Sequence, residues 1–325
     1  MHLIITGAAG MLGQRLATAL LKRGYLTHSD NQKTEITKLT LFDQVAATMP
    51  ADPRLNIVVG DVTDPETIRQ LITPDTAVVY HLAAIVSGEA EQDFDLGMQV
   101  NLAATQILLA ACRRLETAPR FIFSSSIAVF GGELPPVIED GTALTPQSSY
   151  GTQKAIGELL VNDYSRKGFI DGRVLRLPTI VVRPGKPNKA TSTFASSIIR
   201  EPLQGLPANC PVTPETRLWI MSPRQAIKSF IQAAEIPAAA WGEHRSVALP
   251  GVSVSVQEML TALAEIAGPD VLEYITWQAD PMIQRIVASW PADFAPYRAM
   301  QLGFTADHSI QDIIRTFMED EFTER

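Results

Sequence analysis

A tyrosine and a lysine stand four residues apart in the stretch SSYGTQKAIGE, which runs from Ser148 to Glu158. Residues at positions i and i+4 lie on one face of a helix about one turn apart, so Tyr150 and Lys154 could both point into one site. A tyrosinate can accept the proton of an alcohol that is being oxidised, and a nearby ammonium favours the charged form of the phenol. The alternative is that Lys154 pairs with Glu158 on a solvent-exposed face, which would contribute only about a few tenths of a kcal/mol.

A glycine-rich turn directly follows the first predicted strand. The stretch TGAAGMLG places Gly7, Gly10 and Gly13 three residues apart, where the strand passes into a periodic, helical pattern. Glycine lets the backbone approach a pyrophosphate closely, and the N-terminus of the following helix offers free N–H groups and a positive dipole. The turn predicts a dinucleotide site that includes Met11 and Leu12. The alternative is a tight turn that binds no ligand.

Acidic and small residues end the next strands at the same edge. Asp43 ends the second strand, where a carboxylate accepts hydrogen bonds from the adenosine ribose hydroxyls and repels a 2′-phosphate, so NAD is favoured over NADP. Asp43 lies 30 residues after Gly13 rather than about 20, because THSDNQKTEITK precedes the strand. The alternative for Asp43 is a solvated strand end. The other cofactor contacts expected here are Asp61, Val62, Leu82 and Ala83.

These residues need a parallel sheet to bring them to one edge, and the first half of the chain predicts one. Short apolar stretches occur at residues 2–6, 39–42, 55–60, 77–83, 120–125 and 173–177. Helical patterns separate them at about 11–23, 65–72, 99–114 and 150–167. Apolar strands that alternate with helices indicate a doubly wound α/β fold with a sheet buried on both faces.

The alternation of strand and helix patterns ends after Pro178. Prolines become frequent there, and helical patterns return only at 223–235, 255–267 and 309–320. We therefore expect a dinucleotide-binding domain at 1–180 and a smaller, irregular substrate-binding domain at 181–325. Part of about 216–248 is a candidate to return to the first sheet.

The composition argues against several classes of partner. The net charge is −8, so no basic surface is expected for nucleic acid or an anionic membrane. Two cysteines, Cys112 and Cys210, are too few for a disulfide scaffold and indicate a reducing compartment. The five histidines show no metal-ligand spacing, so we expect no metal. The start MHLIITGAAG lacks a signal-peptide pattern and no apolar run reaches the roughly 18 residues of a membrane span, so a cytoplasmic protein that acts on small molecules is expected.

Together these motifs resemble the extended short-chain dehydrogenase/reductase family, which includes sugar-nucleotide epimerases and dehydratases. The resemblance covers nearly the whole chain and is carried by TGAAGMLG, GDVTD, HLAA, FIFSSSIAVFG and YGTQK. It implies a Rossmann fold, bound NAD, and a catalytic group of Ser126, Tyr150 and Lys154, in which Lys154 also holds the nicotinamide ribose. Ser124 or Ser125 could be the working serine instead. The resemblance also implies a homodimer through the helices at 99–114 and 150–167, although their apolar faces could equally be buried within one subunit.

Two further cofactor-site residues follow from the same resemblance. Asn101, before the helical stretch LAATQILLAAC, is expected to place its side chain near the backbone of the fifth strand, and Pro178 is expected beside the cofactor after the sixth.

Within the family, the second half of the chain resembles enzymes that oxidise D-erythronate, a small hydroxy acid of the aldonate type, to its 2-oxo product. Nucleotide-sugar epimerases usually carry an asparagine and a G-P pair after the sixth strand, whereas this chain reads LPTIVVRPG. A small acid needs a cation for its carboxylate. The candidates are Arg183 and Arg224, with Lys189 behind them, and Ser87, Thr179 and Ser192 could bind substrate hydroxyls.

Three functions remain to be weighed. The leading one is an NAD-dependent dehydrogenase of a small hydroxy acid. The second is a sugar-nucleotide epimerase or dehydratase, in which NAD stays bound and the oxidation is reversed. The third is a non-catalytic dinucleotide-binding scaffold or redox sensor, since a fold does not fix a function. A binder needs none of Ser126, Tyr150 and Lys154, so their presence together favours an enzyme.

Overall fold

The first strand lies inside a seven-stranded sheet whose strand order is β13-β9-β7-β6-β1-β4-β5. The computed structural model describes residues 1–27, 32–186 and 190–322, and all neighbouring strands of this sheet are parallel. The strands are β1 (His2–Thr6), β4 (Lys38–Asp43), β5 (Leu55–Val59), β6 (Thr76–His81), β7 (Arg120–Ser126), β9 (Asp171–Leu177) and β13 (Ser246–Ala248). The predicted doubly wound parallel sheet is confirmed.

The order of strands reverses between β1 and β6. From β1 the chain adds β4 and β5 on one side, and it then adds β6, β7, β9 and β13 on the other. Open α/β sheets bind ligands at the carboxyl ends of the strands beside such a switch point. The glycine turn after β1 and the residues after β6 therefore lie where a ligand is expected.

Helices cover both faces of the sheet, which is why its strands are apolar without alternation. Leu3 and Ile5 pack in one buried cluster with α1 (Met11–Arg23) and α8 (Pro223–Glu235). Ile4 points the other way and packs with α2 (Pro65–Leu71), α5 (Ala104–Cys112) and α6 (Ser149–Arg166). The bounds of α1 and α8 agree with the predicted helical patterns.

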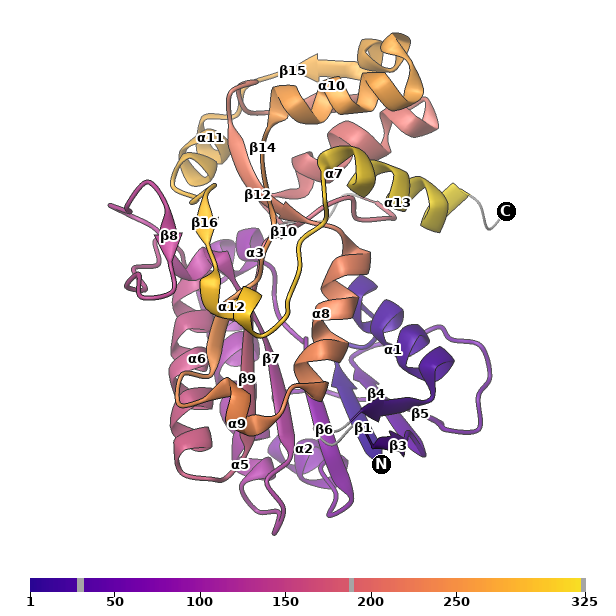
Figure 1. Ribbon diagram of the computed structural model, residues 1–325, viewed down its shortest axis with the longest axis vertical. Coiled ribbons are helices and arrows are strands. Elements are labelled where there is room, and N and C mark those ends of the chain that lie inside the picture. Colours follow the sequence, from indigo (N-terminus) through magenta and orange to yellow (C-terminus); the bar gives the residue numbers. More distant parts are fainter. Residues whose placement is uncertain (28–31, 187–189, 323–325) are drawn as a thin grey trace.

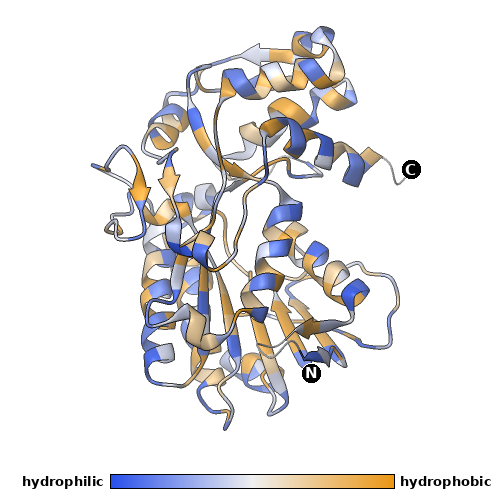
Figure 2. Cartoon of the chain, in the orientation of Figure 1, coloured by the Kyte–Doolittle hydropathy of each residue, from blue (hydrophilic) through white to orange (hydrophobic). Residues whose placement is uncertain are grey.

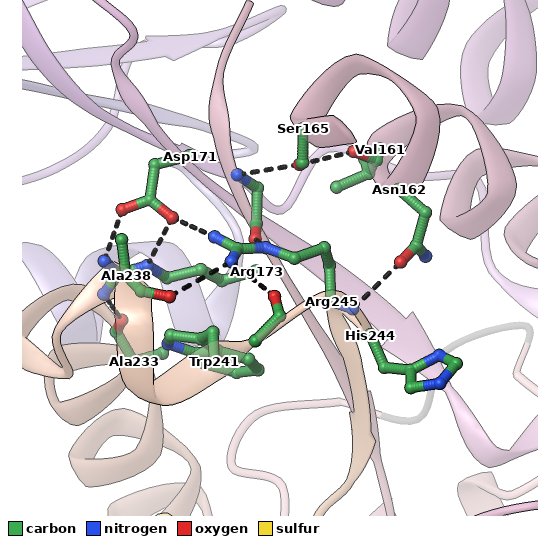
Figure 3. A network of polar contacts seen from close by, with 12 residues as sticks. Val161, Asn162, Ser165, Asp171, Arg173, Ala233, Ala238, Trp241, His244 and Arg245 are labelled. Carbon is green, nitrogen blue, oxygen red and sulfur yellow. Dashed lines mark hydrogen bonds and ion pairs between the residues drawn. The ribbon is translucent and has the colours of Figure 1, made fainter. Parts of the chain in front are cut away.

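A polar network fixes the return of the chain to the sheet at the amino-terminal end of β9 (Figure 3). Arg173 donates through Nη2 to Asp171 at 2.5 Å and through Nη1 to the carbonyl of Ala233 on α8. Arg245, just before β13, also donates to Asp171 and to the carbonyl of Gly172 at 2.7 Å. These contacts hold α8 and β13 against β9, at the end of the strand opposite the catalytic edge.

A second lobe lies above the carboxyl edge of the sheet in Figure 1. Its three-stranded sheet contains β10 (Thr179–Ile180), β12 (Arg217–Met221) and β14 (Val252–Ser255). Apolar side chains from these strands pack with α7 (Thr193–Arg200), α10 (Val256–Ala267) and α13 (Ile310–Phe322) in a separate buried cluster. Of the segment 216–248, β12 thus belongs to the second lobe, whereas α8 packs on the first sheet and β13 is an edge strand of that sheet.

Short elements complete the described parts of the chain. The strand pairs are β2 (Tyr25–Thr27) with β3 (Lys33–Glu35), β8 (Ile138–Glu139) with β16 (Phe294–Ala295), and β11 (Ala208–Cys210) with β15 (Ile275–Trp277). The short helices are α3 (Ser87–Gln92), α4 (Phe94–Gly97), α9 (Ala238–Trp241), α11 (Pro281–Ala288), α12 (Tyr297–Gln301), a π-helix (Met98–Ala103) and 3-10 helices at Ile127–Val129, Pro202–Gln204 and Pro269–Tyr274.

Hydropathy follows these layers, since the central strands are hydrophobic and the helices carry mixed faces (Figure 2). Within the described ranges, no helix is long and apolar enough to cross a membrane.

Candidate active site

The glycine turn joins β1 to α1 in a conformation that needs glycine. Gly7 has φ +72°, and a Cβ there would lie 2.6 Å from the backbone nitrogen of Ala83. A Cβ on Gly13 would lie 2.4 Å from the carbonyl oxygen of Gly7. Gly10 precedes the first residue of α1 and supplies no side chain to cap it. The turn therefore packs tightly on β6 while leaving backbone N–H groups at the start of α1.

A cavity of about 290 Å³ opens beside this turn. Its described lining residues are Gly7, Gly10, Met11, Leu12, Gly13, Leu82, Val86, Ser124, Arg183, Pro184, Lys186, Thr193 and Arg200. The expected cofactor residues of the turn and Leu82 thus share one cavity with the end of β7. Ala83 lies against Gly7, next to this wall.

The carboxylates expected near the adenosine have different environments. Asp43 accepts a hydrogen bond from the backbone nitrogen of Ala9 at 2.9 Å, so its side chain lies against the glycine turn. Asp61 is exposed, and its Oδ1 accepts from the backbone nitrogen and the hydroxyl of Thr63, both at 2.8 Å. Val62 is buried in the core with α2. The carboxylate of Asp61 therefore helps to form the turn into α2, and the side chain of Val62 is a core residue.

Tyr150 and Lys154 lie in the first turns of α6, which begins where Ser148 caps it by accepting from the backbone nitrogen of Gly151 at 3.1 Å. The Lys154 ammonium is buried and donates to the carbonyl of Ser124 on β7 at 2.8 Å. Its nitrogen is 5.7 Å from the centre of the Tyr150 ring. The alternative of a solvent-exposed pair between Lys154 and Glu158 is therefore wrong.

The pKa values of the pair differ from the expectation that Lys154 makes the phenol acidic. Burial raises the pKa of Tyr150 to about 12 and lowers the pKa of Lys154 to about 7, while the charge of Glu158 opposes the second shift. Removal from water disfavours both charged forms. Within the described chain, the Tyr150 hydroxyl has no hydrogen-bond partner and remains available to a ligand.

Below Lys154, a buried ion pair joins α6 to β9. The Glu158 carboxylate accepts from Arg176 through Nε at 3.0 and 3.1 Å and through Nη2 at 2.7 Å. Ser125 donates to the same carboxylate at 2.5 Å. The side chains of Arg176 and Glu158 are 10% and 2% exposed, respectively, so water screens this pair little. It fixes α6, and with it Tyr150 and Lys154, relative to the ends of β7 and β9.

The three serines at the end of β7 have different surroundings. Ser125 is buried and bonded to Glu158, so it does not face a ligand. Ser124 lines the cavity of the glycine turn, and its carbonyl holds Lys154. The half-buried Ser126 hydroxyl accepts from the backbone nitrogen of Ala128 at 3.1 Å and keeps its own proton to donate. The structure thus removes Ser125 from the three candidates for the catalytic serine.

Asn101 makes its hydrogen bonds with the loop after β6 and with α6. Its side chain accepts from the backbone nitrogen of Ile85 at 2.8 Å and donates to the Ile85 carbonyl at 3.1 Å and to Gln153 at 2.7 Å. It is 1% exposed. The residue thus holds the loop after β6 against α6, and its expected position near the backbone of the fifth strand stays a prediction.

The expected substrate residues lie in several places. Ser87 is the first residue of α3. Its neighbour Val86 lines the smaller cavity, and its neighbour Gly88 lines a second, larger cavity. Pro178 is buried between β9 and β10, and Thr179 follows it as a half-buried residue of β10. The other expected substrate residues are Arg183, Ser192, Lys189 and Arg224.

Arg183 lines the smaller cavity and donates to the Ser192 hydroxyl at 3.3 Å. Lys189 lies outside the described residues. Arg224 was expected as a ligand of the substrate carboxylate, but it donates to Glu319 at 3.0 Å and to Asp320, both on α13. It lines neither cavity, so this assignment is wrong: Arg224 joins α8 to the last helix.

The larger cavity, of about 500 Å³, lies between α3, α7, β11 and α11. The ionisable side chains among its described lining residues are Glu91, Glu201 and Asp280, with no Lys, Arg or His. Glu91 accepts from the backbone nitrogen of Ser149, next to Tyr150, at 2.9 Å. Thr193 lines both cavities, so the larger one adjoins the catalytic edge.

Several lining residues of the smaller cavity could not be found from the sequence, namely Val86, Lys186, Thr193 and Arg200. Val86 lies in the loop after β6, Lys186 in the loop after β10, and the other two on α7, so only the packing of the second lobe brings three of them to the glycine turn. The available signal was the stretch TFASSIIR, in which Thr193 and Arg200 are seven residues apart and thus share a helix face. Within the described ranges, no group of three or more His, Cys, Asp or Glu side chains is placed to hold a metal ion.

Comparison with known proteins agrees with this geometry. Residues 3–220 match the NAD dependent epimerase/dehydratase family. The chain is 55% identical over 320 residues to the D-erythronate dehydrogenase of Cupriavidus necator, with 98% of each chain covered. It is 49% identical over 320 residues to the D-erythronate dehydrogenase of Haemophilus influenzae, covering 98% of this chain and 99% of that one.

A solved structure has the same architecture. The crystal structure of the nucleoside-diphosphate-sugar epimerase from Agrobacterium tumefaciens matches with a TM-score of 0.93 and 44% identity, covering 99% of this chain and 94% of that one. The glycine turn, the serines of β7 and the Tyr150–Lys154 pair all lie within the residues that match the family. From these motifs, their geometry and the full-length relatives we conclude that this chain belongs to the NAD dependent epimerase/dehydratase family.

Proposed function

We propose that the protein oxidises D-erythronate to its 2-oxo product with NAD as the hydride acceptor. The observation that carries this proposal is the position of Tyr150 and Lys154 against the end of β7, whose Ser124 shares a cavity with the glycine turn. The names of the two relatives at 55% and 49% identity support the choice of substrate.

The described residues suit a dinucleotide. Gly7 and Gly13 leave no room for a Cβ, so the backbone forms a close turn, and α1 begins without a side-chain cap. When bound, NAD⁺ supplies a positively charged nicotinamide ring that can accept a hydride. We assign the adenosine ribose to Asp43, which lies against the turn, and its charge favours NAD over NADP.

The protein's own groups would handle the proton. The unpartnered Tyr150 hydroxyl would bond the substrate hydroxyl, and Ser126 would donate to the same oxygen. The lowered Lys154 pKa, about 7, means that its ammonium can lose a proton near neutral pH. The neutral amine would then draw the phenol proton to itself as the phenol takes the substrate proton, so that Lys154 ends with the positive charge. Ser87 and Thr179 remain our candidates for the other substrate hydroxyls.

A nucleotide-sugar epimerase is the second candidate, because the solved structure at 44% identity carries that name. One feature weighs against it. LPTIVVRPG replaces the asparagine and the G-P pair expected for nucleotide phosphates.

The test is the absorbance of reduced nicotinamide when the protein is mixed with NAD⁺ and D-erythronate. We expect steady accumulation of NADH, and Tyr150→Phe should lower kcat by roughly 10²–10⁴-fold with the Kd of NAD⁺ unchanged. Tyr164→Phe, on the same helix, is the matched control and should retain activity. An epimerase would show no net NADH, and full activity in Tyr150→Phe would refute the proton-transfer role.

The cytoplasmic location and the homodimer expected from the sequence stay predictions. For the dimer, α6 exposes Leu159 to 65%, an apolar residue that a second subunit could cover. Sedimentation of Leu159→Glu against the unmodified chain tests this arrangement.

A further inference from the structure

Three basic residues of the second lobe line the smaller cavity together with the glycine turn. They are Arg183, Lys186 and Arg200, and they are the charged residues among the described lining. The lining residues that the first lobe contributes are Gly, Met, Leu, Val and Ser, all uncharged. The formal charge at this cavity therefore comes from the second lobe.

The Arg183 guanidinium has no carboxylate partner within the described parts of the chain. Its hydrogen bond goes to the neutral Ser192 hydroxyl at 3.3 Å. Burial, and next the nearby charge of Arg200, lower the pKa of Arg183 to about 10, so it stays cationic at neutral pH. A half-buried cation without a counterion favours an anion that arrives with a ligand.

The backbone of Arg183 is held by α7. Its nitrogen donates to the Ser196 hydroxyl at 3.0 Å, and its carbonyl accepts from Arg200 Nη1 at 2.6 Å. Arg200 also pairs with Glu201 at 2.5 Å. Because Glu201 offsets one of the three cations, about two positive charges remain for a ligand, which matches the two negative charges of a pyrophosphate better than a single carboxylate.

We propose that Arg183, with Lys186 and Arg200 beside it, binds the pyrophosphate of the dinucleotide and holds it against the glycine turn. The second lobe then completes the cofactor site, and Arg183 is a cofactor ligand instead of the substrate-carboxylate ligand expected from the sequence. This inference rests on the proposed use of a nicotinamide dinucleotide. Since Thr193 lines both cavities, the same helix that brings Arg200 to the cofactor forms part of the wall beside the substrate.

The experiment measures binding by calorimetry with three probes: NADH, ADP-ribose, which keeps the pyrophosphate but lacks nicotinamide, and adenosine, which has no phosphate. Arg183→Gln should raise the Kd of NADH and of ADP-ribose by about 10- to 100-fold and leave the Kd of adenosine unchanged. Arg183→Lys should recover part of the loss, because it keeps the charge without the planar fork. The matched control is Arg217→Gln, an exposed arginine of the second lobe that lines neither cavity.

The results distinguish a failure of the proposed function, which is the use of a nicotinamide dinucleotide, from a failure of the pyrophosphate role of Arg183. If the unmodified protein fails to bind NADH, the proposed function itself is wrong. If it binds NADH but Arg183→Gln binds ADP-ribose equally well, the pyrophosphate role is refuted, and a raised KM for the hydroxy acid in that variant would return Arg183 to the substrate. Thermal melting without ligand checks that Arg183→Gln is folded, and Lys186→Gln, an exposed position, should weaken ADP-ribose binding in the same direction.

Discussion

Neutralising Glu158 should both destabilise the protein and shift the pH dependence of the reaction to lower pH, and the structure allows the two effects to be separated. Glu158→Gln keeps the size of the side chain but leaves Arg176, whose side chain is 10% exposed, without a counterion. Breaking a buried ion pair by removing one partner costs about 3–5 kcal/mol. The unfolding entropy of a 325-residue chain is about 0.7 kcal/mol/K, so we expect Tm to fall by about 4–7 °C.

The matched control lies on the same helix. Asp163 and Arg166 form an ion pair at 2.7 Å whose side chains are 57% and 68% exposed. An exposed pair of this kind contributes at most about 0.5 kcal/mol, so Asp163→Asn should lower Tm by less than about 1 °C. Differential scanning calorimetry of both variants measures the contrast. If Glu158→Gln melts within a degree of Asp163→Asn, the ion pair does not clamp α6 to β9 as we argue.

A double variant distinguishes packing from electrostatics. Glu158→Leu with Arg176→Met replaces the ion pair by apolar side chains of similar volume, which is often neutral for stability. Its Tm should therefore recover most of the loss. The charge of Glu158 raises the pKa of Lys154 against the effect of burial, so in the double variant the pH at which kcat/KM rises should shift to a lower value. An unshifted pH profile would show that Glu158 acts on structure alone.

Two other predictions concern the cofactor and the proton. Asp43→Asn keeps an oxygen that can accept from Ala9 but removes the charge, so the ratio of kcat/KM for NADP⁺ to that for NAD⁺ should rise by at least about tenfold; an unchanged ratio would remove Asp43 from cofactor selection. The pKa of Lys154 is lowered to about 7, so its ammonium loses a proton near neutrality. Alcohol oxidation needs the neutral amine to draw the phenol proton away as the phenol takes up the substrate proton, so kcat/KM for D-erythronate should rise between about pH 6 and 8 and then level, whereas a profile that is flat there would contradict this role of Lys154.

Much of the first lobe could be predicted because its strands are continuous apolar runs with helical patterns between them. The predicted helices at 11–23 and 223–235 have the bounds of α1 and α8. β13 was not predicted as a strand, because a three-residue segment has too few positions to show a period. It becomes a strand through pairing with β9, and Arg245 holds it there from the preceding position.

The errors in the site have a common physical cause, which is contact between distant parts of the chain. Arg224 could have reached a substrate carboxylate, but Asp320, 96 residues later, forms an ion pair with it. The expected acidity of Tyr150 failed for the same reason, because burial depends on what packs over a helix and not on its own sequence.

Both lobes contribute residues to the cavity that we propose holds the cofactor. Around the smaller cavity, the first lobe contributes a glycine turn and apolar or neutral side chains, so it offers shape and backbone N–H groups. The second lobe contributes Arg183, Lys186 and Arg200 to the same cavity.

A sequence motif can identify the contribution of the first lobe, because strand, turn and helix are adjacent in the chain. The second depends on how one lobe is placed over the other, so the same arginine could serve a substrate carboxylate or a pyrophosphate until the lobes are seen together. It follows that changes in the second lobe can alter cofactor affinity while the glycine turn and the first sheet stay intact.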